Sequence, residues 1–176
     1  MRVLGRRSRR TLAFVETWVT QADHWLPPDN VQGHPTLVVA RRTSPTNIGL
    51  SLLADLAAYD FGYATVGDTI ARTANTLRTL ESLPRHRGHF YNWYDTETLQ
   101  PLPPRYVSSV DSGNLAGHLL TLRQGLLALR DAPVLSPCIF RGLSDTFGLL
   151  LESSGPEFRH EAASAFHQPP EAACAG

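Results

Sequence analysis

The chain has 176 residues, a length that fits one ordinary domain with a buried core. Its 16 basic residues balance its 16 acidic residues, so no overall field would draw the protein to nucleic acid or to an anionic membrane. Every basic residue is arginine, and apart from a run near the N-terminus the arginines are scattered, which favours codon usage in a GC-rich genome over phosphate recognition. We therefore expect no nucleic-acid partner.

The sequence carries no signal for a metal, a cofactor or a membrane span. The two cysteines, Cys138 and Cys174, suggest neither a disulfide framework nor a zinc site, so a reducing compartment is expected. The histidines lack metal-ligand spacing, and there is no GxSxG elbow, P-loop or dinucleotide fingerprint. Glu16 interrupts the basic start, and no apolar run reaches the roughly 18 residues of a membrane span. We expect a cytoplasmic protein without metal or cofactor.

Apolar residues recur at helical spacing in five segments, which predicts an all-α protein with short strands at most. The expected helices are residues 11–21, 45–60, 66–80, 115–130 and 136–152. Only a few residues separate the second helix from the third, so these two are expected to form an antiparallel hairpin.

The second and third of these helices have the clearest boundary signals. Ser44 can cap the second helix, Pro45 suits its first position, and Gly62 can close its end in a left-handed conformation. Thr65, with Asp68 three residues later, forms a weaker capping box for the third helix.

The segments outside the helices are expected to differ in character. "TLVVA", residues 36–40, is apolar and β-branched, which predicts an extended segment entering the core. Residues 84–109 form a long irregular loop, and such loops are usually functional. After Glu152 the sequence is rich in Ala, Pro and Ser without periodicity. We divide the chain into a basic lead (1–9), a helical domain (10–152) and a disordered tail (153–176).

The long loop contains the aromatic block "GHFYNWYDT", residues 88–96. Strand alternation would place Asn92 with Tyr94 on one face and Trp93 with Asp95 on the other, so a plain buried strand would enclose polar groups. Trp and Tyr can also offer a flat surface to the C–H face of a sugar, while Asn and Asp supply directional hydrogen bonds. Two interpretations stay open: core packing with satisfied polar groups, or contact with carbohydrate.

Three loop carboxylates are candidates for acid and base chemistry, namely Asp29, Asp95 and Asp111. Glycoside hydrolysis needs two such groups flanking the scissile bond. Each carboxylate could equally serve as a cap or a turn ligand, and Asp111 could cap the helix that follows it. Arg41 and Arg42 are expected to form ion pairs with loop carboxylates. The sequence identifies no catalytic pair.

Four blocks occur in an order that resembles a known family. They are "ETWVTQADHWLPPDN", "VARRTSPTNIGL", "RGHFYNWYDT" and "YVSSVDSGNLAGHL". Together they resemble the glycoamylase-like region of the cyclic β-1,2-glucan synthases, large bacterial membrane enzymes, over about residues 10–152. The four blocks in this order are specific, whereas any one of them alone is not.

The resemblance implies helical hairpins of an (α/α)6 toroid with a substrate cleft at one end. It also implies anomer-retaining transglycosylation on linear β-1,2-glucan, which closes the chain into a ring. The residues that it places in the sugar cleft are Arg42, Thr43, Asn47, Asn92, Trp93, Tyr94, Asp95, Asp111, Ser112 and Asn114. Five helices cannot close a toroid of twelve, so the toroid is expected to be incomplete.

The catalytic glutamates of the family are expected beyond the position of Glu152, so the isolated chain is expected to be inactive. A non-catalytic module that binds glucan or a partner, and a truncated inactive reading frame, are the alternatives. An incomplete toroid leaves helix faces uncovered, which predicts a homo-oligomer, aggregation or a companion chain that completes it. The resemblance also leaves open an association with the inner membrane through a larger synthase.

Overall fold

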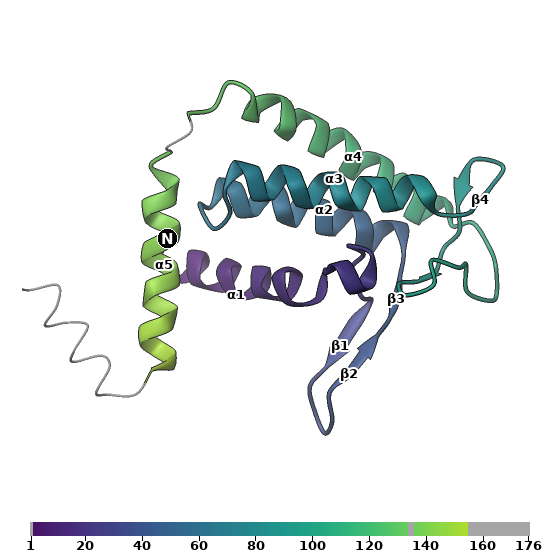
Figure 1. Ribbon diagram of the computed structural model, residues 1–176, viewed down its shortest axis with the longest axis horizontal. Helices are drawn as coiled ribbons and strands as arrows, with labels where there is room; N and C mark the ends of the chain where they lie inside the picture. The colour runs from purple at the N-terminus through teal and green to yellow at the C-terminus, as the bar shows by residue number, and fades with distance from the viewer. Residues whose placement is uncertain (1, 134–135, 155–176) are drawn as a thin grey trace, which may run out of the picture.

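The computed structural model describes residues 2–133 and 136–154 of the chain. Its helices are α1 (Arg2–Trp18), α2 (Pro45–Asp60), α3 (Val66–Ser82), α4 (Ser109–Leu129) and α5 (Cys138–Ser153), with one 3-10 turn, η1 (Gln21–Asp23). The prediction of an all-α protein with five helices is confirmed (Figure 1). The tail predicted from residue 153 lies outside the described residues from residue 155 onward.

The capping residues set the boundaries of α2 and α3 as the sequence predicts. Ser44 accepts a hydrogen bond from the backbone N–H of Asn47 at 3.2 Å, and Pro45 occupies the first turn of α2. Gly62 follows the helix with a φ of 77°, in the left-handed region. Thr65 accepts from the N–H of Asp68 at 3.1 Å and thereby caps α3.

Two helix starts differ from the prediction. The first helix begins at Arg2 instead of Thr11, so the basic run is part of α1. The fourth helix begins at Ser109, and its cap is Ser108, whose hydroxyl accepts from the N–H of Asp111 at 3.1 Å. The prediction that Asp111 caps this helix is therefore wrong, because an earlier serine takes that role and places Asp111 in the first turn.

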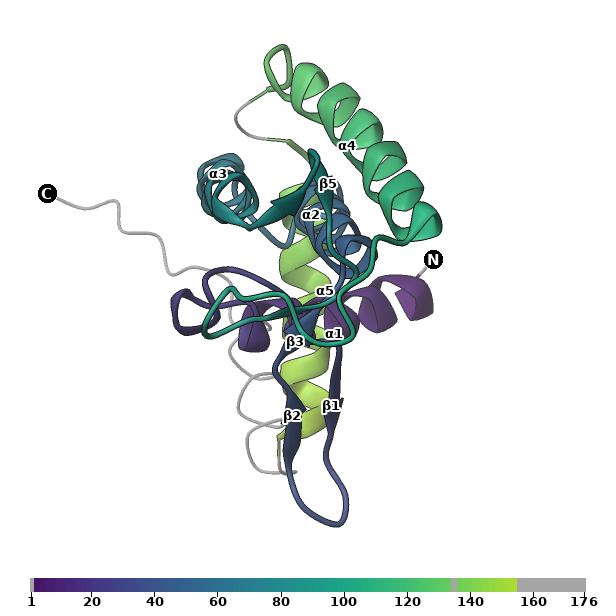
Figure 2. The same ribbon diagram turned by 90° about the vertical axis from the view of Figure 1, so that its right-hand side faces the viewer.

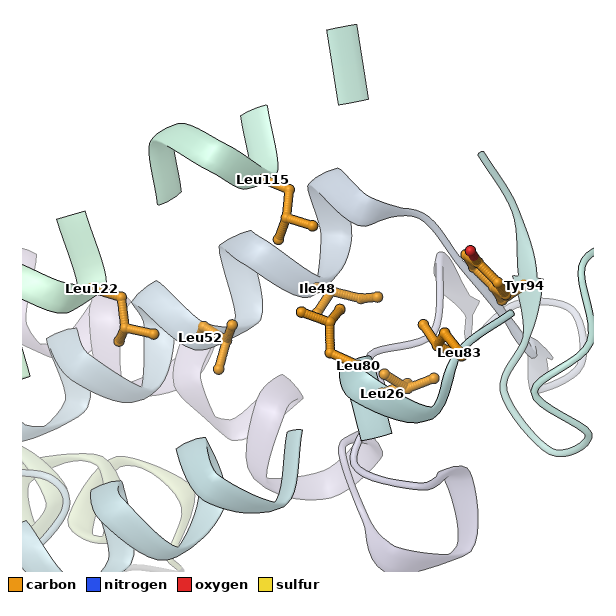
Figure 3. Packing of buried hydrophobic residues seen from close by; sticks show 8 residues of the cluster. All are labelled: Leu26, Ile48, Leu52, Leu80, Leu83, Tyr94, Leu115 and Leu122. Carbon is orange, nitrogen blue, oxygen red and sulfur yellow. The ribbon is translucent and has the colours of Figure 1, made fainter. Parts of the chain in front are cut away.

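Helix α2 lies at the centre of the helical layer, against α1, α3 and α4 (Figures 1 and 2). A side chain at Gly49 of α2 would overlap the ring of His118 of α4, so this glycine permits the close approach of the two helices. The main apolar cluster joins three of these helices to the loops and is shown in Figure 3: Leu26, Ile48, Leu52, Leu80, Leu83, Tyr94, Leu115 and Leu122. A second cluster joins α1 to α2 through Leu12, Val15, Val19 and Ala58.

Short antiparallel strand pairs connect the loops. Strand β1 (Asn30–Gln32) pairs with β2 (Val38–Ala40), β3 (Arg42–Thr43) pairs with β6 (Tyr94–Asp95), and β4 (Arg85–His86) pairs with β5 (His89–Phe90).

The β1–β2 hairpin projects away from the helices (Figure 1). Leu37 and Val38 are 63% and 54% exposed. The prediction that residues 36–40 enter the core is therefore wrong. Within the described residues, β1 and β2 form a two-stranded sheet of their own that extends away from the helical layer, so Leu37 and Val38 face solvent.

Helices α4 and α5 carry uncovered apolar side chains, as expected for an incomplete toroid. These are Val110, Leu120 and Leu127 on α4, and Phe140, Leu143 and Leu150 on α5. Among residues 2–133 and 136–154, no helix combines the length and the apolar character that crossing a bilayer requires. Self-association through the apolar side chains stays a prediction, which sedimentation at increasing concentration can check.

Candidate functional site

Pairing of β3 with β6 brings together two sequence blocks that are about fifty residues apart. Arg42 lies opposite Asp95, and Thr43 lies opposite Tyr94. The start of α2 follows β3 directly, and side-chain contacts reach from it to the first turn of α4. Three of the four sequence blocks therefore meet at one end of the helical layer, near the label β3 in Figure 1, and the first block adds Asp29, which contacts Arg42 there.

An arginine stacked on a tryptophan forms one side of this site. The guanidinium carbon of Arg42 lies 4.7 Å from the centre of the Trp93 ring. The same guanidinium donates to one oxygen of Asp29, from Nε at 3.1 Å and from Nη2 at 2.9 Å. Asn47 donates to the other oxygen of Asp29 at 3.2 Å. Asp29 therefore fixes the arginine that covers the indole.

Asn92 links this stack to α4. With its amide nitrogen directed at α4, Asn92 donates to Asp111 Oδ2 at 2.8 Å. Its oxygen then accepts from the indole N–H of Trp93 and from the hydroxyl of Tyr106, both at 2.8 Å. Asn92 is buried, so these bonds satisfy a polar group that would otherwise be costly to enclose.

Asp111, in the first turn of α4, extends the network to Thr46 and Asn114. Its Oδ1 accepts from the hydroxyl of Thr46 at 2.6 Å, and Thr46 in turn accepts from Asn114 at 3.1 Å. Ser112 instead donates to the carbonyl of Ser108 in its own helix at 2.7 Å. The network thus runs from Asp29 to Asn114, whereas Ser112 is bonded locally.

Asp95 lies beside the network, but its carboxylate stabilises the turn formed by the residues that follow it. Its Oδ1 accepts from the N–H of Thr98 at 2.7 Å, from the Thr98 hydroxyl at 3.0 Å and from the N–H of Glu97 at 3.0 Å. The hydrogen bond from the Thr98 backbone is the main reason that the pKa of Asp95 is lowered. A general acid needs a raised pKa, so Asp95 is unsuited to that role.

Two of the predicted site residues, Thr43 and Tyr94, have no exposed surface. The Tyr94 hydroxyl donates to the carbonyl of Pro84 and accepts from the N–H of Tyr91, both at 2.8 Å. Burial raises the pKa of this hydroxyl. Both residues lie in the β3–β6 pair, next to Arg42 and Trp93 in the sequence, so their burial anchors the segments that carry the stack.

The structure adds residues that were not among the predicted site residues. Thr46 and Tyr106 belong to the blocks "VARRTSPTNIGL" and "YVSSVDSGNLAGHL". Their position in these blocks, beside predicted site residues, is the sequence feature that could have identified them. Arg42 forms the expected ion pair with a loop carboxylate, Asp29, at 2.9 Å. Arg41 pairs instead with Asp23, outside the network, at 2.5 Å. Among the described residues, no group of three or more His, Cys, Asp or Glu side chains could hold a metal ion.

Comparison with known proteins gives a sequence relative and two fold relatives. Over 126 residues, 72% of this chain, the sequence is 48% identical to the cyclic β-(1,2)-glucan synthase NdvB of Rhizobium meliloti. The fold matches candidate glucoamylases from Bacteroides fragilis (TM-score 0.60, 19% identity, 91% of this chain) and Bacteroides caccae (TM-score 0.56, 22% identity, 81% of this chain). No family model matches the chain.

The fold is thus that of the glucoamylase-like helical proteins, built from helical hairpins. Within that class, the chain is a relative of one segment of the cyclic β-(1,2)-glucan synthases, and the resemblance predicted from the four blocks is confirmed. The chain spans 4% of the length of the synthase, and 38% and 35% of the two solved structures.

Proposed function

We propose that this chain binds linear β-1,2-glucan at the end of the helical layer where Arg42, Trp93 and Asn92 meet. The observation that carries the proposal is the Arg42–Trp93 stack, tied by Asn92 to Asp111, in a chain 48% identical to a glucan synthase segment. In a complete synthase-like protein, such a site would hold the glucan during transglycosylation and ring closure.

The chemistry of the site suits a neutral sugar. Trp93 is half-buried and fixed by its indole N–H, so its aromatic surface can pack against sugar C–H groups. Asp29 and Asp111 supply acceptors, while Arg42, Asn47 and Asn114 supply donors within the same network. Sugar hydroxyls both donate and accept, so they can bond to groups of both kinds.

We assign binding, not bond cleavage, to this chain. A glycoside hydrolase needs a carboxyl group with a raised pKa opposite a second carboxylate. The three loop carboxylates already hold their neighbours: Asp29 holds Arg42, Asp95 holds its own turn, and Asp111 holds Thr46.

Thermal unfolding with and without linear β-1,2-glucan tests this function. A ligand that binds only the native state stabilises it by about 2.7 kcal/mol at a concentration of 100 times Kd. We expect a cooperative transition, followed by tryptophan fluorescence, that moves to higher temperature with glucan and does not move with an α-1,4-glucan of equal length. A cooperative transition insensitive to β-1,2-glucan would contradict binding. The absence of any cooperative transition would favour an inactive fragment.

Replacing Trp93 with alanine should weaken glucan binding by about 1–3 kcal/mol, because one aromatic face loses its contact with sugar. Titration calorimetry measures this change. Phe140→Ala is the matched control, since Phe140 is an aromatic residue of α5 that is 72% exposed and belongs to no part of the network. Unchanged affinity of a folded Trp93→Ala variant would remove Trp93 from the site.

A further inference from the structure

A pocket lies between α1, α2 and α3 and shares no residue with the network around Trp93. Its volume is about 340 Å³, within the range of small-molecule sites. Glu16 of α1, Asp55 of α2, and Arg72 and Asn75 of α3 line it. Trp25 and Tyr63 also belong to the lining, but the Tyr63 ring is stacked on Phe61 and lies under Arg9, so Trp25 is the aromatic residue that can face a ligand. Figure 2 shows α1 and α3 on two sides of α2.

Asp55 supplies a buried carboxylate with an unused oxygen. The residue is 3% exposed, and its Oδ1 accepts from Arg72 Nε at 2.7 Å. Within the part of the chain that the structure describes, its Oδ2 has no hydrogen-bond partner. A buried carboxylate oxygen of this kind favours a ligand that donates a hydrogen bond.

The charges around the pocket are largely paired, which favours a neutral ligand. Of the three carboxylates in the lining, Glu16 is paired with Arg9 and Asp55 with Arg72, both at 2.7 Å. The guanidinium of Arg72, bonded to Asp55, opposes a cation at that carboxylate. Asn75 accepts from Arg78 at 2.7 Å through its oxygen, which leaves its amide nitrogen as a donor. Donors and acceptors side by side match hydroxyl groups, each of which does both.

The backbone at Trp25 is held by hydrogen bonds from α3 that are separate from the network around Trp93. Both His24 and Trp25 have left-handed backbones, with φ of 54° and 61°, which is uncommon for residues other than glycine. Hydroxyls of α3 hold them, since Thr79 donates to the His24 carbonyl at 2.7 Å and Thr76 donates to the Trp25 carbonyl at 3.1 Å. Glu16 and Trp25 also belong to "ETWVTQADHWLPPDN", the block whose Asp29 takes part in the network around Trp93.

We propose that the pocket between α1, α2 and α3 is a second sugar-binding site, which takes one neutral hexose unit. The sugar donates a hydroxyl hydrogen bond to Asp55 Oδ2, and its C–H groups lie against the aromatic surface of Trp25. This site does not depend on glucan binding at Trp93, and a glucan chain could use the two sites separately.

The indole N–H signals of the three tryptophans, Trp18, Trp25 and Trp93, test the proposal in one experiment on the full chain labelled with ¹⁵N. The probe is the β-1,2-linked disaccharide of glucose. The Trp25 signal is expected to move and to saturate with this disaccharide, and to stay in place with methylammonium or acetate. Trp93 reports on the other site, so failure of one site is distinguishable from failure of the other.

Ala71→Phe is the blocking variant, because Ala71 is an exposed residue of α3 that lines the pocket. It should raise the Kd read from the Trp25 signal by about tenfold or more while leaving the response of Trp93 unchanged. Ala128→Phe, at an exposed position of α4, is the matched control. The proposal is overturned if the Trp25 signal of the folded wild-type chain ignores the disaccharide, follows methylammonium or acetate instead, or responds unchanged in Ala71→Phe.

Discussion

Replacing Arg72 with methionine is expected to lower the free energy of unfolding by about 3–5 kcal/mol at neutral pH, because it leaves the charge of Asp55 buried without its partner. The two side chains lie 2.7 Å apart, and Asp55 is 3% exposed. Arg72 also donates to the carbonyl of Val15 in α1 at 3.2 Å, so one side chain joins three helices. Urea unfolding of the wild-type chain and the variant measures the difference.

The pH dependence of this loss follows from the pKa of Asp55. Burial raises this pKa above its ordinary value, although the hydrogen bond from Arg72 opposes the shift. A carboxyl group with a raised folded pKa favours the native state most at low pH, and this contribution declines as the pH rises through the folded pKa. Without Arg72 the pKa rises further, so the deficit of Arg72→Met should narrow as the pH falls toward about 4.

Asp55→Asn provides the control for this experiment. Combined with Arg72→Met, it removes the buried charge and should recover most of the lost stability at neutral pH. A double variant as unstable as Arg72→Met alone would show that the lost contact with Val15, not the unpaired carboxylate, is responsible.

Replacing Tyr94 with alanine should cost about 3–5 kcal/mol, the range for removing a large aromatic side chain from a core. Tyr94 has no exposed surface and packs in the main apolar cluster with Leu26 and Leu83 (Figure 3). Its loss should also loosen the β3–β6 pair, in which Thr43 lies opposite Tyr94, and with it the stack of Arg42 on Trp93. Denaturant unfolding gives the stability, and glucan titration under native conditions gives the effect on binding.

Tyr94→Phe separates the ring from its hydroxyl. It keeps the packing but leaves the Tyr91 N–H and the Pro84 carbonyl without their partner, so a smaller cost of about 1–3 kcal/mol is expected. If Tyr94→Phe were as damaging as Tyr94→Ala, the hydrogen bonds and not the buried ring would hold this loop.

The aromatic block shows why one sequence pattern supported two interpretations. Tyr94 lies in the core with its hydroxyl satisfied, whereas Trp93, next to it, is half-buried under Arg42. Asn92 is buried and yet takes part in the network through Trp93 and Asp111. Residue types indicate what each side chain can bond, but the direction of each one depends on the strand and helix that lie against it.

Five helices and the caps of α2 and α3 could be predicted from the sequence, because a serine before a proline, or a threonine three residues before an aspartate, acts within one turn of backbone. The order of its four blocks indicated the family, which the 48% identity confirms. Residues 36–40 project outward and Arg42 stacks on Trp93 because of contacts between segments far apart in the chain, which form only when the helices and loops pack. The cap of α4 is local, but Ser108 and Asp111 are both good capping residues, and the helix start that the packed structure adopts selects Ser108.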